Sequence, residues 1–146
     1  MPKTVEFFFD LASVYSYLAA TQIRAIAAKH GAQVAWKPFV LGAVFKATSN
    51  SMPASVPAKA KYMLDDVPRW AKQYGIEWRM ASNWPVNAVK AMRLCIVGDK
   101  QGKAEATALA AFRALWIDDH DLTAEPTLRE IARAAGLDAD PALAAI

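Results

Sequence analysis

Two serines, Ser13 and Ser16, lie where a hydrophobic strand pattern changes into a helical one. The order of residues predicts a strand, a tight connection and then a helix, with Ser13 at the start of that helix. Backbone N–H groups at a helix start are unpaired and the helix dipole is positive there, so an anion is favoured. A serine hydroxyl at this point can cap the helix, donate to a bound anion, or do both. If the anion is a thiolate, the environment lowers the pKa of the thiol and raises the amount of nucleophile at neutral pH. Ser16, one turn further on, is expected to be structural.

The chain contains one cysteine, Cys95, so it can form neither an intramolecular disulfide nor a thiolate metal cluster. Cys95 lies in an apolar helical stretch, which predicts a packed core residue rather than a nucleophile. Residues 118–121 read Asp-Asp-His-Asp, a composition that can hold a metal, but a polar turn is the interpretation we prefer.

The element that positions Ser13 is the run Val5–Phe9. Its three successive phenylalanines do not alternate with polar residues, which predicts a strand covered on both faces. The helix that follows should end near His30, where Gly31 supplies a left-handed stop and His30 acts as a cap. Residues 33–37 form a second strand pattern. A strand, a helix and a strand make a βαβ unit, which should be parallel and right-handed.

After Phe39 the pattern is that of a polar, proline-containing loop over residues 48–58, followed by helices. One helix should be kinked or restarted at Pro68, and a later one should end at Gly98. The predicted fold class is therefore α/β, with a βαβ part over residues 1–45 and an α-helical domain over residues 46–146.

The end of the sequence offers a helix start at Asp140-Pro141, with few residues left to build on it. No segment is evident that would pair with the free edge of the first strand, and an exposed apolar edge invites association. We therefore expect that sequence is missing after Ile146, or that another chain supplies it.

Composition restricts the function classes. The chain has 146 residues, 55% of them hydrophobic and 21% charged, enough for one packed domain, and its net charge is +3. The cations are scattered, without the aromatic-lined basic stripe of a nucleic-acid-binding surface, although a mild positive field favours small anions. Residues 1–10 lack the pattern of a secretory signal and no stretch is long enough to span a bilayer, so a cytoplasmic protein is expected.

Several segments together carry a resemblance to a known family. Residues 9–18 resemble the Phe-Asp-Phe-x-Ser-Pro-Tyr-Ser-Tyr-Leu opening of 2-hydroxychromene-2-carboxylate isomerases, which belong with kappa-class glutathione transferases in a thioredoxin-like superfamily. The similarity continues, in family order, through the segments at residues 36–39, 45–48, 57–63, 85–87, 91–93 and 112–116. The resemblance implies a thioredoxin-like fold with a large helical insertion, whose C-terminal half is absent from this sequence.

The resemblance also implies a function. Redox relatives carry Cys-x-x-Cys where this chain has residues 13–16, so a reaction here that needs a thiol must borrow one, and in the family that thiol is glutathione. The implied reaction interconverts 2-hydroxychromene-2-carboxylate and trans-o-hydroxybenzylidenepyruvate, with Ser13 as the catalytic serine that holds the thiolate. Asn50 and Lys59 match positions that contact glutathione, and Trp84 matches an aromatic residue against the substrate ring. A homodimer is the expected assembly.

Alternatives remain at each of these positions. Lys59 can be a solvated helix lysine, Asn50 a turn former and Trp84 a half-buried loop residue. The family usually has proline where this chain has Val14, and its Val-Pro-Thr-like loop with a cis-proline, which binds glutathione, has no equivalent before Ile146. The protein could also be a kappa-class glutathione transferase or peroxidase, or a catalytically inactive thioredoxin-like interaction module.

Overall fold

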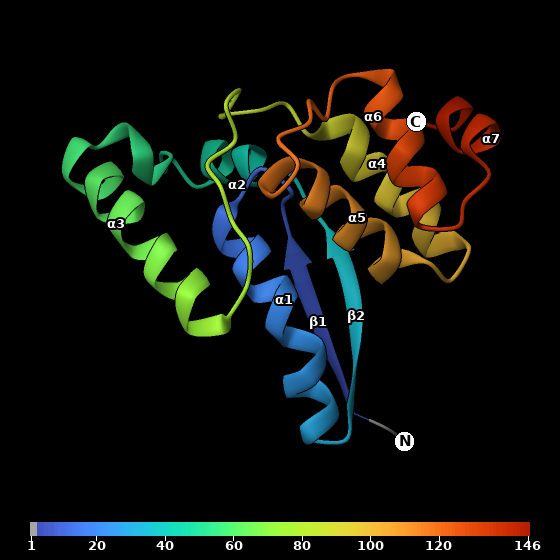
Figure 1. The fold of residues 1–146 in the computed structure, drawn as a ribbon, viewed down its shortest axis with the longest axis horizontal. Helices are drawn as coiled ribbons and strands as arrows, with labels where there is room; N and C mark the ends of the chain where they lie inside the picture. The colour runs from blue at the N-terminus through green and yellow to red at the C-terminus, as the bar shows by residue number, and fades with distance from the viewer. Residues whose placement is uncertain (1–2) are drawn as a thin grey trace.

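The computed structural model describes residues 3–146. It opens with the predicted βαβ unit, in which strand β1 (Lys3–Phe9) leads through helix α1 (Val14–Lys29) to strand β2 (Ala32–Pro38). The two strands are parallel, and Phe7 lies opposite Trp36 in the register (Figure 1). The parallel pairing confirms the prediction, and the cap of α1 at His30 is confirmed as well.

The two faces of this small sheet differ. Phe9 is buried against Trp36 and against Phe112 of helix α5 (Ala104–Trp116), with ring centroids 5.7 Å apart in both pairs. Phe8 points to the opposite face and is 58% exposed. The prediction that both faces are covered is therefore wrong for the described residues. The phenylalanine run is explained instead by Phe7 and Phe9 packing into the core while Phe8 meets Phe39 edge-on.

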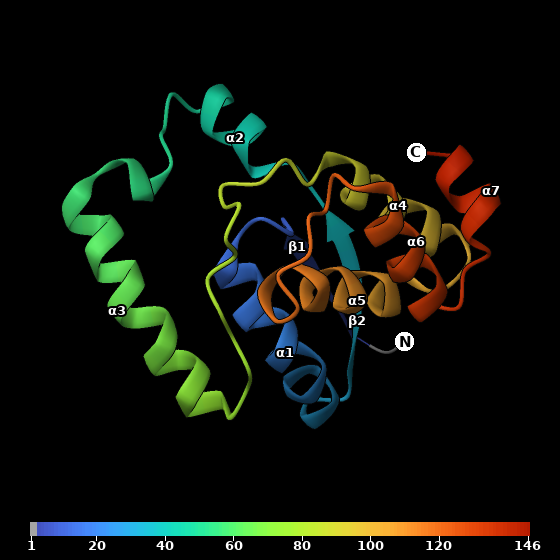
Figure 2. The same ribbon diagram turned by 45° about the horizontal axis from the view of Figure 1, so that its top comes forward.

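The segment after β2 forms an arm of three helical pieces, α2 (Leu41–Ala47), the short 3₁₀ helix η1 (Pro53–Ser55) and α3 (Pro57–Tyr74). Helix α2 was not predicted. Of the two expectations for Pro68, a kink or a restart, the restart is wrong, because α3 runs through Pro68 as one helix. The arm has little buried surface, because α2 and η1 contain no buried residue and α3 buries Val67 and Ala71 alone. In both views α3 lies on one side of α1, away from the remaining helices (Figures 1 and 2).

Helices α4 (Val89–Lys100), α5 (Ala104–Trp116), α6 (Glu125–Ala134) and α7 (Ala139–Ala144) pack on the other side of α1 and share one hydrophobic core with the sheet. The predicted helix through Val89, Met92 and Ile96 is confirmed, but it ends at Lys100, two residues beyond Gly98. A Cβ atom at Gly98 would lie 2.2 Å from Oγ1 of Thr107, so the glycine permits the close approach of α4 and α5. The turn itself uses Gly102, whose φ is +68°.

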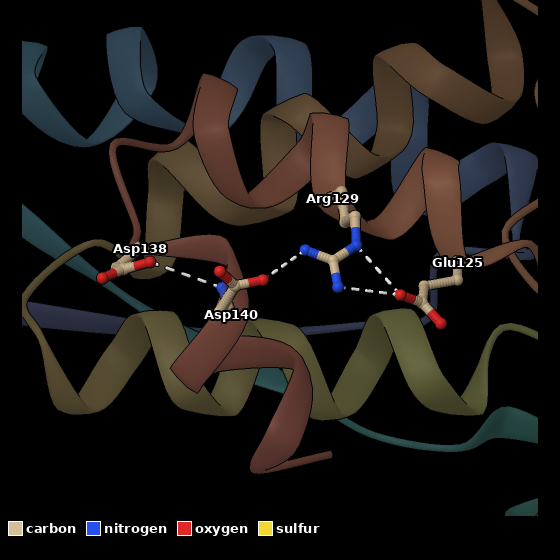
Figure 3. A network of polar contacts seen from close by, with 4 residues as sticks. All are labelled: Glu125, Arg129, Asp138 and Asp140. Atoms are coloured by element: carbon tan, nitrogen blue, oxygen red, sulfur yellow. Dashed lines mark hydrogen bonds and ion pairs between the residues drawn. The ribbon is translucent and has the colours of Figure 1, made fainter.

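The last helix begins earlier than predicted. Asp138, rather than Asp140, is the N-cap of α7, and its side chain accepts a hydrogen bond from the Asp140 N–H. The Asp140 carboxylate instead pairs with Arg129 of α6, which also binds Glu125 one turn earlier (Figure 3). The Arg129–Asp140 pair joins α7 to α6, whereas the Arg129–Glu125 pair lies within α6. Exposed ion pairs of this kind add little stability.

Within residues 3–146, no helix combines the length and apolar character needed to cross a membrane.

Candidate functional site

The connection between β1 and α1 is held from several directions, beginning with Asp10. This carboxylate is buried, with 8% of the residue exposed. One oxygen accepts the Ala12 N–H and the other accepts the Leu41 N–H, each at 2.8 Å. Asp10 therefore ties the end of β1 to the first residue of α2. Its own N–H donates to Oγ of Ser16 at 3.3 Å, in keeping with the structural role expected of that serine.

Ser13 is the N-cap of α1, as predicted. Its backbone is extended, with φ −92° and ψ 113°, and its Oγ accepts a hydrogen bond from the Ser16 N–H at 3.3 Å. A hydroxyl that accepts in a cap still has its O–H available as a donor. Ser13 is partly buried. An anionic ligand bound there would lose part of its hydration, and its electrostatic attraction to the positive start of α1 would be stronger than in bulk water.

Two tryptophans and a methionine fix the backbone just before Ser13. Trp84 Nε1 donates to the Ala12 carbonyl at 2.8 Å, and Trp116 Nε1 donates to the Leu11 carbonyl at 3.0 Å. The Leu11 N–H points at the sulfur of Met92, 3.4 Å away. The Trp84–Pro85 peptide bond is cis, a feature that the sequence did not predict. Contacts from Trp84, Met92 and Trp116 thus hold the backbone of residues 11 and 12 in place at the start of α1.

A cavity of about 720 Å³ opens in front of this start. Its walls come from the β1–α1 connection, the arm, residues 84–89 and Met92 of α4. Most of its lining side chains are apolar, such as Val14, Phe45, Met52, Met63, Val86 and Met92. The volume lies within the range of small-molecule sites, roughly 300–1,000 Å³. An apolar body with a few polar groups is the kind of ligand that this cavity would accept.

Three of the four predicted site residues line this cavity, namely Ser13, Lys59 and Trp84. Lys59 comes from the first turn of α3 and Trp84 from the loop after it. Asn50 does not belong to the lining: it is exposed, its N–H donates to the Phe45 carbonyl, and its Oδ1 accepts the Ser51 N–H at 2.8 Å. The roles assigned to these four residues remain predictions.

Sequence reasoning missed two tyrosines that also line the cavity, Tyr15 and Tyr62. Their hydroxyls donate to the two oxygens of Asp66, at 3.1 Å and 3.3 Å respectively. Burial, followed by the hydrogen bond to Asp66, raises the pKa of Tyr15 to about 12, so this phenol keeps its proton at neutral pH. A signal was present in the sequence, because Tyr62 and Asp66 follow Lys59 at helical spacings of three and seven.

Cys95 and the acidic residues of segment 118–121, the other candidates for chemistry in the sequence, have structural roles. Cys95 is buried as predicted, and burial raises the pKa of its thiol to about 12, which keeps it un-ionised and unreactive. Asp119 accepts from the Ser82 N–H at 2.7 Å and pairs with Arg79 at 2.9 Å, and hydrogen bonding to the Ser82 backbone is the main cause of its lowered pKa. Asp121 accepts from Thr123. Residues 118–121 thus include a hydrogen-bonded turn that anchors the loop carrying Trp84.

A family model described as a DSBA-like thioredoxin domain matches residues 4–146. The 2-hydroxychromene-2-carboxylate isomerase of Sphingobium xenophagum is 31% identical over 142 residues, which is 96% of this chain and 72% of that protein. Glutathione S-transferase kappa 1 of Caenorhabditis elegans is 32% identical over 125 residues, 80% of this chain and 54% of that protein.

The fold agrees with these matches. A solved structure of a 2-hydroxychromene-2-carboxylate isomerase superposes with a TM-score of 0.84 at 24% identity, over 95% of this chain and 68% of that one. The chain belongs to the DSBA-like thioredoxin domain family, which confirms the predicted thioredoxin-like fold class. Within that family, its similarity is to proteins named as isomerases and kappa-class glutathione transferases. Several relatives are matched over little more than half of their length, for example 55% of the Pseudomonas putida isomerase.

Proposed function

We propose that this chain carries the thiol-binding part of a glutathione-dependent isomerase that interconverts 2-hydroxychromene-2-carboxylate and trans-o-hydroxybenzylidenepyruvate. The observation that carries the proposal is the meeting of Ser13, Lys59 and Trp84 on one largely apolar cavity at the start of α1. The names of the relatives support the reaction class.

The residues present fit glutathione. Bound as a thiolate, it would supply a nucleophile that adds to the conjugated carbon of the substrate, permits rotation about the resulting single bond, and leaves again without net oxidation. Ser13 would donate its free O–H to the sulfur while the N–H groups of the first turn of α1 add positive potential. Its cap bond to Ser16 keeps the hydroxyl in place.

Lys59 and Trp84 would place the two partners. The Lys59 ammonium group attracts carboxylates, which glutathione and the substrate both carry, and water screens this attraction because the residue is exposed. The Trp84 side chain lies on the cavity wall with its N–H bound to Ala12, and it would stack against the aromatic ring of the substrate. Asn50 would have to turn from its local bond with Ser51 to reach a ligand.

A second candidate is a kappa-class glutathione transferase, favoured by the similarity to the transferases of Caenorhabditis elegans and Rattus norvegicus. It would use the same thiolate against other electrophiles. A cytoplasmic homodimer remains part of either proposal, and sedimentation of the purified protein tests the assembly.

The decisive experiment measures glutathione binding by calorimetry and isomerisation of 2-hydroxychromene-2-carboxylate by absorbance, with Ser13→Ala alongside. Binding and turnover that both fall in the variant support the proposal. A chain that conjugates 1-chloro-2,4-dinitrobenzene but leaves the chromene unchanged supports the transferase. Turnover that survives Ser13→Ala removes the role given to Ser13.

A further inference from the structure

The carboxylate of Asp66 joins two helices beside the cavity. Oδ2 accepts from the Tyr15 hydroxyl of α1 at 3.1 Å, and Oδ1 accepts from the Tyr62 hydroxyl of α3 at 3.3 Å. Tyr15 lies two residues after Ser13, in the first turn of α1. Tyr62 lies one turn after Lys59 in α3. The contact thus connects the two cavity walls that carry the proposed thiol-binding serine and the proposed carboxylate-binding lysine.

The part of α3 that precedes Asp66 contains no buried residue, and its contact with the core comes from partly buried Met63. The buried residues of this helix, Val67 and Ala71, both lie in its second half, and the preceding α2 and η1 bury none. Beyond the end of α3, Tyr17 donates to the Glu77 carbonyl at 2.6 Å, which again holds the far end. Both ribbon views show α3 joined to the body through long connections at its two ends (Figures 1 and 2).

We propose that Asp66 is a positioning residue, which holds the middle of α3 against the start of α1 through Tyr15. The contact thereby sets Lys59 and Tyr62, in the part of α3 that precedes it, relative to Ser13. The inference rests on the proposed function for the identity of the ligand, but the link between the helices does not. The Tyr15 phenol, protonated at neutral pH, is a lasting donor to the carboxylate. A hydrogen bond to a charged acceptor is stronger than a neutral one, which suits a link on a thinly packed element.

The expected effect on glutathione affinity follows from the fraction of molecules in which both cavity walls are in place. When only a fraction of molecules has the cavity walls in place, the apparent dissociation constant rises by the inverse of that fraction. Loss of the Tyr15–Asp66 bond should leave the arm in place in a minority of molecules, which corresponds to about five-fold weaker glutathione binding. The core of the protein should be unaffected, because none of the residues involved belongs to it.

The test uses four variants of the whole chain. Tyr15→Phe and Asp66→Asn weaken the link between the helices, while Tyr62→Phe removes a bond inside α3 and leaves that link intact. Asp65→Asn is the matched control, since it removes the same charge one residue earlier and breaks a 3.0 Å pair with Lys61 inside α3. Hydrogen exchange of the amides of residues 58–66 is measured for each, together with glutathione calorimetry for Tyr15→Phe, Asp66→Asn and Asp65→Asn.

Faster exchange in Tyr15→Phe and Asp66→Asn, with Tyr62→Phe and Asp65→Asn close to the unmodified protein, supports the proposal. Five-fold weaker glutathione binding in the first two at an unchanged melting temperature supports it further. Unchanged exchange in Tyr15→Phe, or an equal change in Asp65→Asn, overturns it. If the unmodified chain binds no glutathione, the proposed function fails, and the exchange measurement still decides whether Asp66 positions α3.

Discussion

The indole N–H of Trp84 donates a 2.8 Å hydrogen bond to the carbonyl of Ala12, the residue directly before Ser13. A side chain proposed to face the substrate therefore also holds the backbone that presents the serine. Trp84→Phe keeps an aromatic ring and removes the donor, so we expect a loss of about 1 kcal/mol in unfolding free energy. Turnover at saturating substrate should fall more than affinity for the chromene. Steady-state kinetics and urea unfolding measure the two effects, and a variant with full turnover contradicts the positioning role.

Ser13 has two separable tasks, capping α1 and donating to a thiolate. Ser13→Ala removes both and should cost about 1 kcal/mol of stability. Ser13→Asp keeps a good cap but replaces the donor by a negative charge, so the fold should remain as stable as the unmodified chain while glutathione binding is lost. Thermal unfolding and calorimetry on the two variants distinguish the tasks. Glutathione bound by Ser13→Asp at unchanged affinity would show that the serine is a cap alone.

The close approach of α4 and α5 depends on Gly98. A methyl group there would lie 2.2 Å from Thr107 Oγ1, so Gly98→Ala should destabilise the protein by about 2 kcal/mol through overpacking. Gly42 in α2 is the matched control, because an added Cβ meets nothing within 4 Å. Gly42→Ala should gain about 0.5 kcal/mol by lowering the entropy of the unfolded chain. Chemical denaturation measures both, and equal effects would contradict the packing argument.

Asp119 anchors the loop that carries Trp84, and its pKa is lowered from the usual 3.8, chiefly by the hydrogen bond from the Ser82 backbone. A carboxyl group with a lowered folded-state pKa stabilises the fold above its unfolded pKa and loses that contribution as the pH falls through the folded value. Exchange of the Ser82 amide should therefore accelerate, after correction for intrinsic rates, on acidification below about pH 4. In Asp119→Asn this additional acid step should be absent.

Local signals allowed Ser13 to be placed correctly, because its strand, turn and helix are encoded by adjacent residues. The exposure of Phe8 could not be predicted in that way, since the covered face of the sheet is decided by Phe112, more than a hundred residues later. Gly98 was read as a helix end because the contact that requires it comes from Thr107 in the next helix.

The cavity residues also divide into those with a signal in the sequence and those positioned by contacts between distant segments. Lys59 and Trp84 were predicted through a family resemblance, and the structure brings both to the cavity of Ser13. The Tyr15–Asp66 contact joins residues 51 positions apart, for which the chain itself gives no pairing signal. Helix α2 escaped prediction because its seven residues are too few for the helical spacing of Leu41, Val44 and Phe45 to stand out as a pattern. Its first N–H is instead fixed by Asp10.

The open face of the sheet has a practical consequence for laboratory work on this chain. Phe8 is 58% exposed while the molecule is folded, so an environment-sensitive fluorescent dye has an apolar surface to adsorb to before any melting begins. Dye-based thermal scans should start from a high baseline and understate cooperativity. The intrinsic emission of buried Trp36 and Trp116 will follow unfolding more faithfully.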